Sequence, residues 1–106
     1  MHGMKNMGNL MKQAKKLQED MAKAQEELGT MTVTGTAGGQ GVTIEMNGHH
    51  HVQSIKINPD VVDKDDVEML EDLILTAIND AAKKVSDMAE QHMGKYTKGF
   101  NIPGLF

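Results

Sequence analysis

The feature that most constrains this chain is a stripe of apolar residues near its N-terminus, spaced at alternating steps of three and four. The stripe consists of Met7, Leu10, Ala14, Leu17, Met21, Ala24 and Leu28. This spacing places every member at the a and d positions of a heptad repeat, as in a coiled coil. The pattern predicts a helix over residues 7–28, about 33 Å long. Asn6 or Asn9 is its expected N-cap, and Gly29 its C-cap residue.

The apolar spacing then changes to simple alternation, which is typical of half-buried strands. Three such segments are predicted, at residues 30–34, 42–46 and 52–57. The Gly-rich residues 35–41 between the first two predict a flexible turn. Asn47-Gly48 predicts a type I′ hairpin between the second and third, because both residues tolerate a positive φ. Together these segments predict an antiparallel three-stranded meander.

A second amphipathic helix is predicted after Asn58-Pro59-Asp60 ends the third strand. Its N-cap is expected to be Asp63, Asp65 or Asp66, and Asp65 and Glu68 have the spacing of a capping box. Apolar residues recur at helical spacing as far as about Met93, a length of about 40 Å. They are Val67, Leu70, Ile74, Ala77, Ile78, Ala81, Val85 and Met88, with His92 continuing the stripe as a residue of the core edge or an interface.

Apolar residues off this stripe, namely Met69, Leu73 and Leu75, indicate that the first half of the second helix is buried on two sides. The last 13 residues, 94–106, contain three Gly and one Pro and are expected to form a loosely ordered tail.

The predicted fold class is therefore α+β, in the order α-β-β-β-α, with the meander between two long helices in a single domain over residues 1–106. A compact domain of this length has a radius of gyration near ~13 Å, so helices of this length must project from it. Because their apolar stripes continue along the projecting parts, we expect a second copy to cover them. The sequence thus predicts a homodimer.

Composition argues against catalysis. The chain has no Cys, which excludes disulfides and thiolate sites and fits a reducing cytoplasm. Its two serines, Ser54 and Ser86, do not lie in a nucleophile elbow, and residues 35–41 lack the Lys-Ser/Thr of a P-loop. No apolar run approaches ~18 residues, so no membrane partner is expected. Three aromatic residues are too few for a base-stacking platform. We expect no catalytic residue, no small-molecule substrate and no cofactor.

Two clusters suggest a metal site but do not complete one. His49 and His51 share a face of a strand and could hold two corners of a zinc or nickel site, yet a third ligand is not evident. The acidic block of residues 60–72 lacks the Gly at loop position 6 of an EF-hand, and its acids suit the N-terminus of a helix. We expect no metal in either cluster, and read the histidines as partly exposed hairpin residues.

The charges are segregated along the chain, although its formal net charge is −4. Residues 1–18 carry four lysines and no acid. These lysines fall at heptad positions f, b and c, opposite the apolar stripe, and we call them the basic face: Lys5, Lys12, Lys15 and Lys16. Bases at a helix N-terminus oppose the helix macrodipole, which favours an anionic partner. The alternative is a solvated face with pairs such as Lys15–Glu19, Lys16–Asp20 and Glu19–Lys23.

Several segments, taken in order, resemble one known family. They are Gly8–Ala14, Gln25–Leu28, Val33–Gly39, Asn47-Gly48, Ile55–Pro59, Leu70–Ile74, Asn79–Lys84 and Pro103–Phe106. Together with the element order, they resemble the YbaB/EbfC family of bacterial nucleoid-associated proteins, from about Met7 to Phe106.

This resemblance implies a tweezer-like homodimer that binds double-stranded DNA, with little sequence preference in many members. It also implies a cytoplasmic, nucleoid-associated role in nucleoid organisation and gene regulation. The family attributes DNA contact to its terminal helical parts, which here carry Lys5, Lys12, Lys15, Lys16, Lys83, Lys84, Lys95 and Lys98. The chain has no Arg for a bidentate guanine contact, and its negative net charge predicts weak, salt-sensitive binding.

A protein–protein interaction module for a replication or repair partner is the alternative, because Met-rich helices make adaptable contact surfaces. Such a module needs Met4, Met7, Leu10 and Met11 exposed, whereas a DNA-binding protein needs the basic face.

Overall fold

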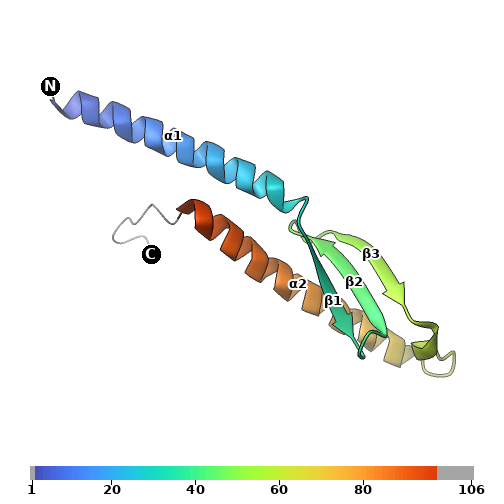
Figure 1. The fold of residues 1–106 in the computed structure, drawn as a ribbon. Helices are drawn as coiled ribbons and strands as arrows, with labels where there is room; N and C mark the ends of the chain where they lie inside the picture. Colours follow the sequence, from blue (N-terminus) through green and yellow to red (C-terminus); the bar gives the residue numbers. More distant parts are fainter. Residues whose placement is uncertain (1, 98–106) are drawn as a thin grey trace.

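The computed structural model describes residues 2–97, and their side chains from residue 7 to residue 96. Along the chain lie α1 (His2–Leu28), β1 (Thr32–Ala37), β2 (Val42–Asn47), β3 (Val52–Ile57), the 3₁₀-helix η1 (Pro59–Val61) and α2 (Val67–Thr97). The strands form one antiparallel sheet in the order β1-β2-β3, as Figure 1 shows. The α+β fold and its α-β-β-β-α order are confirmed.

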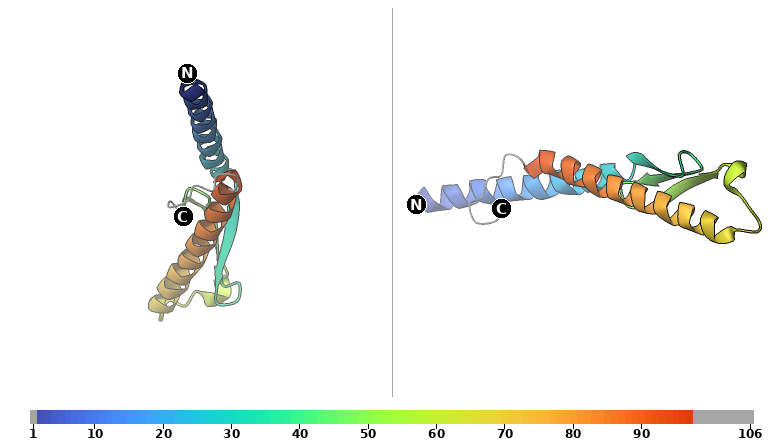
Figure 2. Two further views of the ribbon diagram at one scale, coloured as in Figure 1. Left: turned by 90° about the vertical axis from the view of Figure 1, so that its left-hand side faces the viewer. Right: turned by 90° about the horizontal axis from the view of Figure 1, so that it is seen from below.

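The molecule is a long body with a projecting helix. It measures 78 × 25 × 16 Å and has a radius of gyration of 20.9 Å, well above the ~13 Å of a compact domain. In Figures 1 and 2, α2 covers one face of the sheet and α1 extends away from it. Every side chain from residue 7 to residue 16 is exposed. We call this projecting part of α1 the arm.

The core lies between the sheet and α2. Its buried side chains come from the inward face of the sheet and one stripe of α2: Ala37, Val42, Ile44, Met46, Ala77, Ala81 and Val85. The small alanines bring the helix close to β1. A Cβ at Gly35 would lie 2.4 Å from the Ala77 carbonyl oxygen and 2.5 Å from the Ala81 nitrogen. Only glycine fits there without moving α2.

The Gly-rich turn is shorter than predicted. Gly35, Thr36 and Ala37 belong to β1 and pair with Ile44, Thr43 and Val42, so the turn comprises only residues 38–41. The prediction was wrong because the glycine at 35 serves helix packing rather than turn formation. Gly38 and Gly39 do supply the positive φ angles of the turn, at 62° and 72°.

The second hairpin forms where predicted but with different turn chemistry. Its positive φ, 63°, belongs to His50 and not to Asn47 or Gly48. The Asn47 side-chain oxygen instead accepts hydrogen bonds from the backbone N–H groups of His49 (2.9 Å) and His51 (3.1 Å). Gly48 is needed for another reason, because its Cβ would lie 2.3 Å from the Leu28 carbonyl oxygen.

The helix ends partly differ from the prediction. α1 begins at His2, so neither Asn6 nor Asn9 caps it, whereas Gly29 directly follows its last residue as expected. α2 begins at Val67, and the Asp66 side chain accepts from the Met69 N–H at 3.3 Å, which makes Asp66 the N-cap. The predicted Asp65–Glu68 capping box is therefore not formed, because the N-cap is Asp66 and the residue three positions later is Met69.

The tail prediction was wrong for residues 94–97, which form the last turn of α2. The helix continues there as far as Tyr96, whose hydrogen bond to Glu27 of α1 stabilises the extra turn. The remainder of the predicted tail, residues 98–106, lies outside the described part of the chain.

Side chains of α2 occupy the outer edge of β1. The Thr36 N–H donates to Asp80 Oδ2 at 3.0 Å, and Lys84 Nζ donates to the Thr34 carbonyl at 2.9 Å. The two side chains are themselves paired at 3.1 Å. The Thr36 N–H, and then Lys84, lower the pKa of Asp80. At the opposite edge of the sheet, β3 is exposed along its whole length.

Candidate nucleic-acid interface

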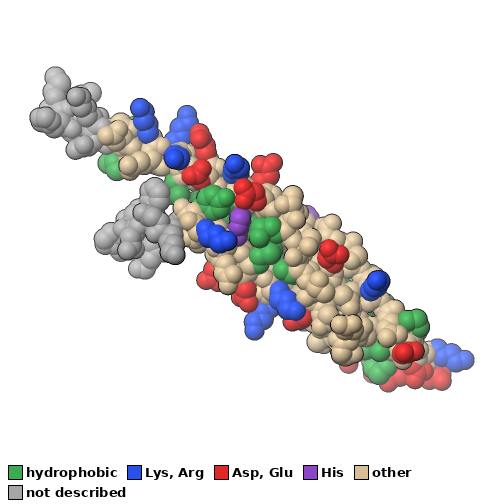
Figure 3. Space-filling view, viewed as in Figure 1, with side chains coloured by type: hydrophobic (Ala, Val, Ile, Leu, Met, Phe, Trp, Pro, Cys, Tyr) green, Lys and Arg blue, Asp and Glu red, His purple; other side chains and the backbone are tan. Residues whose placement is uncertain are grey.

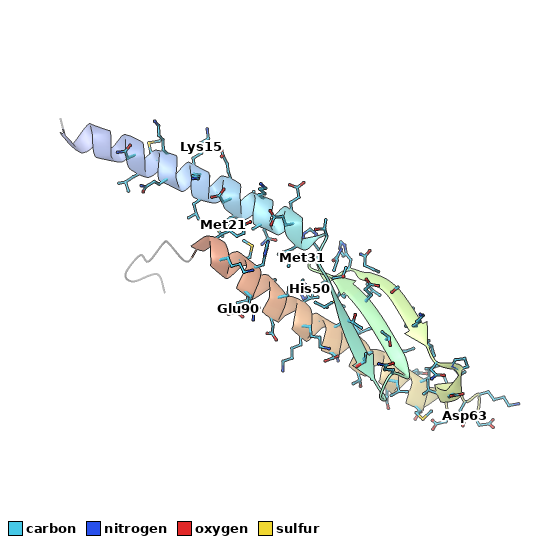
Figure 4. The ribbon with its side chains drawn as sticks, viewed as in Figure 1. Lys15, Met21, Met31, His50, Asp63 and Glu90 are labelled. Carbon is cyan, nitrogen blue, oxygen red and sulfur yellow. The ribbon has the colours of Figure 1, made fainter. Side chains whose placement is uncertain are left out.

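The helical spacing of α1 separates its lysines from its apolar seam. Ala24 and Leu28 are buried, and Leu17 and Met21 are half-buried on the side that meets the rest of the molecule. Figure 4 shows Met21 on the side of α1 turned toward α2 and Lys15 on the side turned away. Lys12, Lys15 and Lys16 of the basic face are therefore presented to solvent, as the heptad positions predict.

Three lysines of the basic face, Lys12, Lys15 and Lys16, are exposed. Within residues 7–96 the only ion pairs closer than 4.0 Å are Lys84–Asp80 and His92–Glu27. The expected pairs of Lys15 with Glu19 and Lys16 with Asp20 are not formed, nor is that of Glu19 with Lys23. The ammonium groups of these three lysines are thus available to an external anion. The Lys5 side chain lies outside the described part.

The lysines of the C-terminal part are in different situations. Lys83 and Lys95 are exposed on α2, and Lys95 lies in its last turn, at the end that contacts α1. Lys84 is bound to Asp80 and to the Thr34 carbonyl, so it serves the β1 edge. Lys98 lies outside the described residues.

Charge is distributed unevenly over the molecule. Figure 3 shows lysine side chains along the arm and a concentration of acidic side chains at the opposite tip, where Figure 4 labels Asp63. This tip is built from η1, the following loop and the start of α2, which carry the acidic block. Such a distribution attracts an anionic partner to the arm and repels it from the tip.

Two carboxylates of the acidic block make local hydrogen bonds. The Asp63 side chain accepts from the Asp65 N–H at 2.9 Å, and Asp66 caps α2. Among the described residues no group of three His, Cys, Asp or Glu side chains is arranged to hold a metal ion. Asp63 and Asp66 thus serve the loop before α2 and the N-terminus of α2.

Each histidine of the run has its own contact. His49 Nε2 donates to the Gln25 carbonyl of α1 at 2.6 Å. His50 Nε2 lies 3.4 Å from the Ser86 hydroxyl of α2. The His49 and His51 rings meet edge to face at 6.3 Å. His92 lies between the helices, 3.0 Å from Glu27, in agreement with its predicted place at the core edge.

An exposed apolar surface was missed by the sequence reasoning. In the sheet register, Val52, Ile55 and Ile57 oppose the core residues Met46, Ile44 and Val42, so they share the inward face of the sheet. However, α2 covers only β1 and β2, and Val52 and Ile55 both remain 48% exposed. The alternation in residues 52–57 signals an inward face, but sequence does not show how far α2 reaches across it.

The same region corrects a second expectation. The first half of α2 was predicted to be buried on two sides, yet Leu75 is 58% exposed and Val67 52%. Ile78 lies two positions before Asp80, on the opposite side of the helix from the β1 edge. At about 100° per residue, Val67 and Leu75 lie near Ile78 around the helix and therefore share the side away from the β1 edge. We call Val52, Ile55, Ile57, Val67 and Leu75 the open apolar face.

No helix in the described part of the chain is long and apolar enough to cross a lipid bilayer. The fold and the lysines together define a small α+β protein with a basic helical arm. The model of the YbaB/EbfC DNA-binding family matches residues 4–100. The chain therefore belongs to this family of nucleoid-associated DNA-binding proteins, which is not known for enzymatic activity, and the resemblance stated above is confirmed.

Individual relatives agree with this assignment. The chain is 56% identical to a nucleoid-associated protein of Exiguobacterium sibiricum over 106 residues, which cover all of both chains. It is 55% identical over 102 residues to nucleoid-associated proteins of Bacillus thuringiensis and Bacillus anthracis, covering 96% of this chain and 94% of each relative. The crystal structure of HP0035 from Helicobacter pylori has the same fold, with a TM-score of 0.65 at 20% identity, covering 80% of this chain and 86% of that one.

Proposed function

We propose that this chain is a non-enzymatic nucleoid-associated protein that binds double-stranded DNA as a homodimer, with low sequence specificity, in nucleoid organisation and gene regulation in the cytoplasm. The observation that carries the proposal is that Lys12, Lys15 and Lys16 of the basic face are exposed and form no ion pair within residues 7–96, on a projecting helix in a member of a DNA-binding family. The names of its relatives support the nucleoid role.

The chemistry of the basic face suits phosphates rather than bases. Lys12, Lys15 and Lys16 lie within about 6 Å along the helix axis, and each ends in a compact point charge. Contact with phosphates releases counterions and carries no sequence information. The chain has no Arg, which makes the commonest specific contact to guanine. We therefore expect affinity to depend strongly on salt and weakly on sequence.

The open apolar face provides the surface for dimerisation. Large apolar residues that stay exposed on a strand and on the helix packed against the same sheet are typical of an interaction site in a small protein. A two-fold axis roughly parallel to the strands would bury this face in both copies and leave both arms pointing the same way. Two arms so placed could hold a duplex between them, with the number of basic-face lysines doubled.

The test is a duplex-DNA gel shift at several salt concentrations. Replacing Lys12 and Lys16 by Ala should lower affinity about equally for all sequences. It should flatten the plot of log K against log salt by as much as ~3.6 in the dimer, at ~0.9 per lost phosphate contact. Replacing Lys56 and Lys64, exposed lysines away from the arm, gives a charge-matched control that should change the slope little. Equal slopes for the two variants would contradict the proposal.

The alternative, a protein–protein interaction module, is favoured by one observation. Leu10 and Met7 are each 63% exposed and Met11 is 71% exposed on the arm; the side chain of Met4 is outside the described part. The described part of the arm therefore carries both the exposed lysines that a DNA-binding protein needs and the exposed apolar residues that an interaction module needs. Wild-type DNA binding by the Lys12/Lys16 variant, with an unchanged mass in solution, would favour this alternative.

A further inference from the structure

Among the described side chains of α1, those held against the rest of the molecule lie toward its C-terminal end. No side chain from residue 7 to residue 16 is buried, and the first half-buried position is Leu17. From Glu27 to Lys12 the helix runs about 22 Å, so a tilt of about 20° at the base would move Lys12 by about 8 Å. The minor groove of B-DNA is only about 6 Å wide. Small changes at the base thus decide where the basic face lies.

One carboxylate at this base binds two side chains of α2. Glu27 Oε2 accepts hydrogen bonds from His92 Nε2 at 3.0 Å and from the Tyr96 hydroxyl at 3.2 Å. The two donors are four residues apart on one side of α2, and their rings meet edge to face at 5.6 Å. The His92 side chain is 13% exposed and that of Glu27 38%, so the bond is partly buried.

The protonation of Tyr96 suits the arrangement. Partial burial first, and the Glu27 charge second, raise the pKa of Tyr96. The Tyr96 hydroxyl therefore stays protonated, as a donor to Glu27 must be. Hydrogen bonds to an ionised acceptor are shorter and stronger than those between neutral groups.

The β2–β3 hairpin holds the same turn of α1 from another side. His49 donates to the Gln25 carbonyl, and the Gly48 N–H donates to the Leu28 carbonyl at 2.9 Å. Both bonds are to the backbone of α1, so they fix where this helix ends. The Glu27 contacts, by contrast, tie α1 directly to α2, in the same part of α1 as the buried Ala24 and Leu28.

We propose that Glu27, held by His92 and Tyr96, is the positioning residue that fixes the direction of the arm and thereby the placement of the basic face. The expected effect on DNA affinity rests on the proposed function, whereas the role of Glu27 in directing the arm does not. If loss of Glu27 leaves each arm correctly directed in about half of the molecules, a dimer that needs both arms loses about fourfold in affinity.

The arm direction can be measured without DNA. The chain has no Cys, so spin labels at Gln13→Cys and Asp87→Cys, both exposed positions, report the α1–α2 distance by pulsed EPR. Dilution with unlabelled protein keeps each measured pair within one chain. We expect one narrow distance distribution for the parent and loss of the narrow peak in Glu27→Ala. Glu27→Gln, which keeps the shape and an acceptor oxygen, should restore it.

Ser86→Ala is the matched control, since it removes the His50 contact between the hairpin and α2 without touching α1. Ser86→Ala should keep the narrow peak. Every variant should also keep the helix content of the parent protein. A narrow peak in Glu27→Ala would overturn the proposal. A broad peak with unchanged DNA affinity, while the Lys12/Lys16 variant loses binding, would also overturn the positioning role and leave the proposed function standing. If the parent protein does not bind DNA, the proposed function fails. The EPR distances alone then decide whether Glu27 fixes the direction of the arm.

Discussion

At the scale of single residues, Asp80 shows how one side chain can serve a strand and a helix at once. It lies on α2, accepts from the backbone of β1 at Thr36, and pairs with Lys84 one turn later. Both partners favour the ionised carboxylate and so lower its pKa below the usual 3.8. A group of this kind ties the stability of the fold to pH.

The expected pH dependence has a definite sign. Because the pKa of Asp80 is lower in the folded chain, its stabilisation is complete above the usual value of 3.8 and is lost as pH falls through the folded value. Asp80→Asn keeps an oxygen for the Thr36 N–H but cannot ionise. The difference in urea midpoint between the parent and Asp80→Asn should therefore shrink below about pH 4. A difference that stays constant down to about pH 2.5 would contradict this account.

At the scale of elements, close contact between β1 and α2 decides which residues the sheet tolerates. The contact depends on a residue without a side chain at 35 and on Ala77 and Ala81 opposite it. Periodicity alone predicted both elements, because the spacing of apolar residues is a property of each segment by itself.

Gly35→Ala tests this packing. The added methyl would lie within 2.5 Å of two backbone atoms of α2, so the helix must shift, which we expect to cost about 1–3 kcal/mol or more. The measurement is the free energy of unfolding in urea. Gly8→Ala on the arm meets nothing within 4 Å and should leave stability unchanged or raise it by up to ~1 kcal/mol. Equal stability of both variants would show that α2 adapts freely.

What sequence could not predict at this scale involves atoms from other elements. Gly35 and Gly48 looked like turn residues, yet each makes room for a helix backbone. The positive φ at His50 was missed because Asn47 uses its side chain to organise the turn. The outward direction of Lys12, Lys15 and Lys16 followed from heptad spacing. The contacts of Glu27 could not be predicted in this way, because they depend on the C-terminal end of α2 packing against α1.

At the scale of the whole molecule, an elongated shape leaves a small chain with apolar surface it cannot cover. The arm and the open apolar face are exposed at separate places, and α2 spans only two of the three strands. The sequence predicted the dimer from the length of its helices; the structure adds a sheet surface to that argument.

Ile55→Asp tests the open apolar face as the dimer surface. A charge there would be buried without a partner, so we expect the mass in solution to fall to that of a monomer while the circular dichroism spectrum is kept. Lys56→Asp places the same charge on the neighbouring residue, which points to the other face of the sheet, and should leave the dimer intact. A dimeric Ile55→Asp protein would exclude this surface.

The occupied edge of β1 has a consequence for aggregation. A sheet that is open at both edges can add strands from copy after copy, and this is how edge strands lead to fibrils. Here Lys84 and Asp80 already bond the Thr34 carbonyl and the Thr36 N–H, so a strand added at the β1 edge would first have to displace two side chains of α2. A copy added at the β3 edge would present its own β1 edge, guarded in the same way, outward. We therefore expect these two side chains to disfavour unlimited edge-to-edge growth of the sheet in a chain with so much exposed apolar surface.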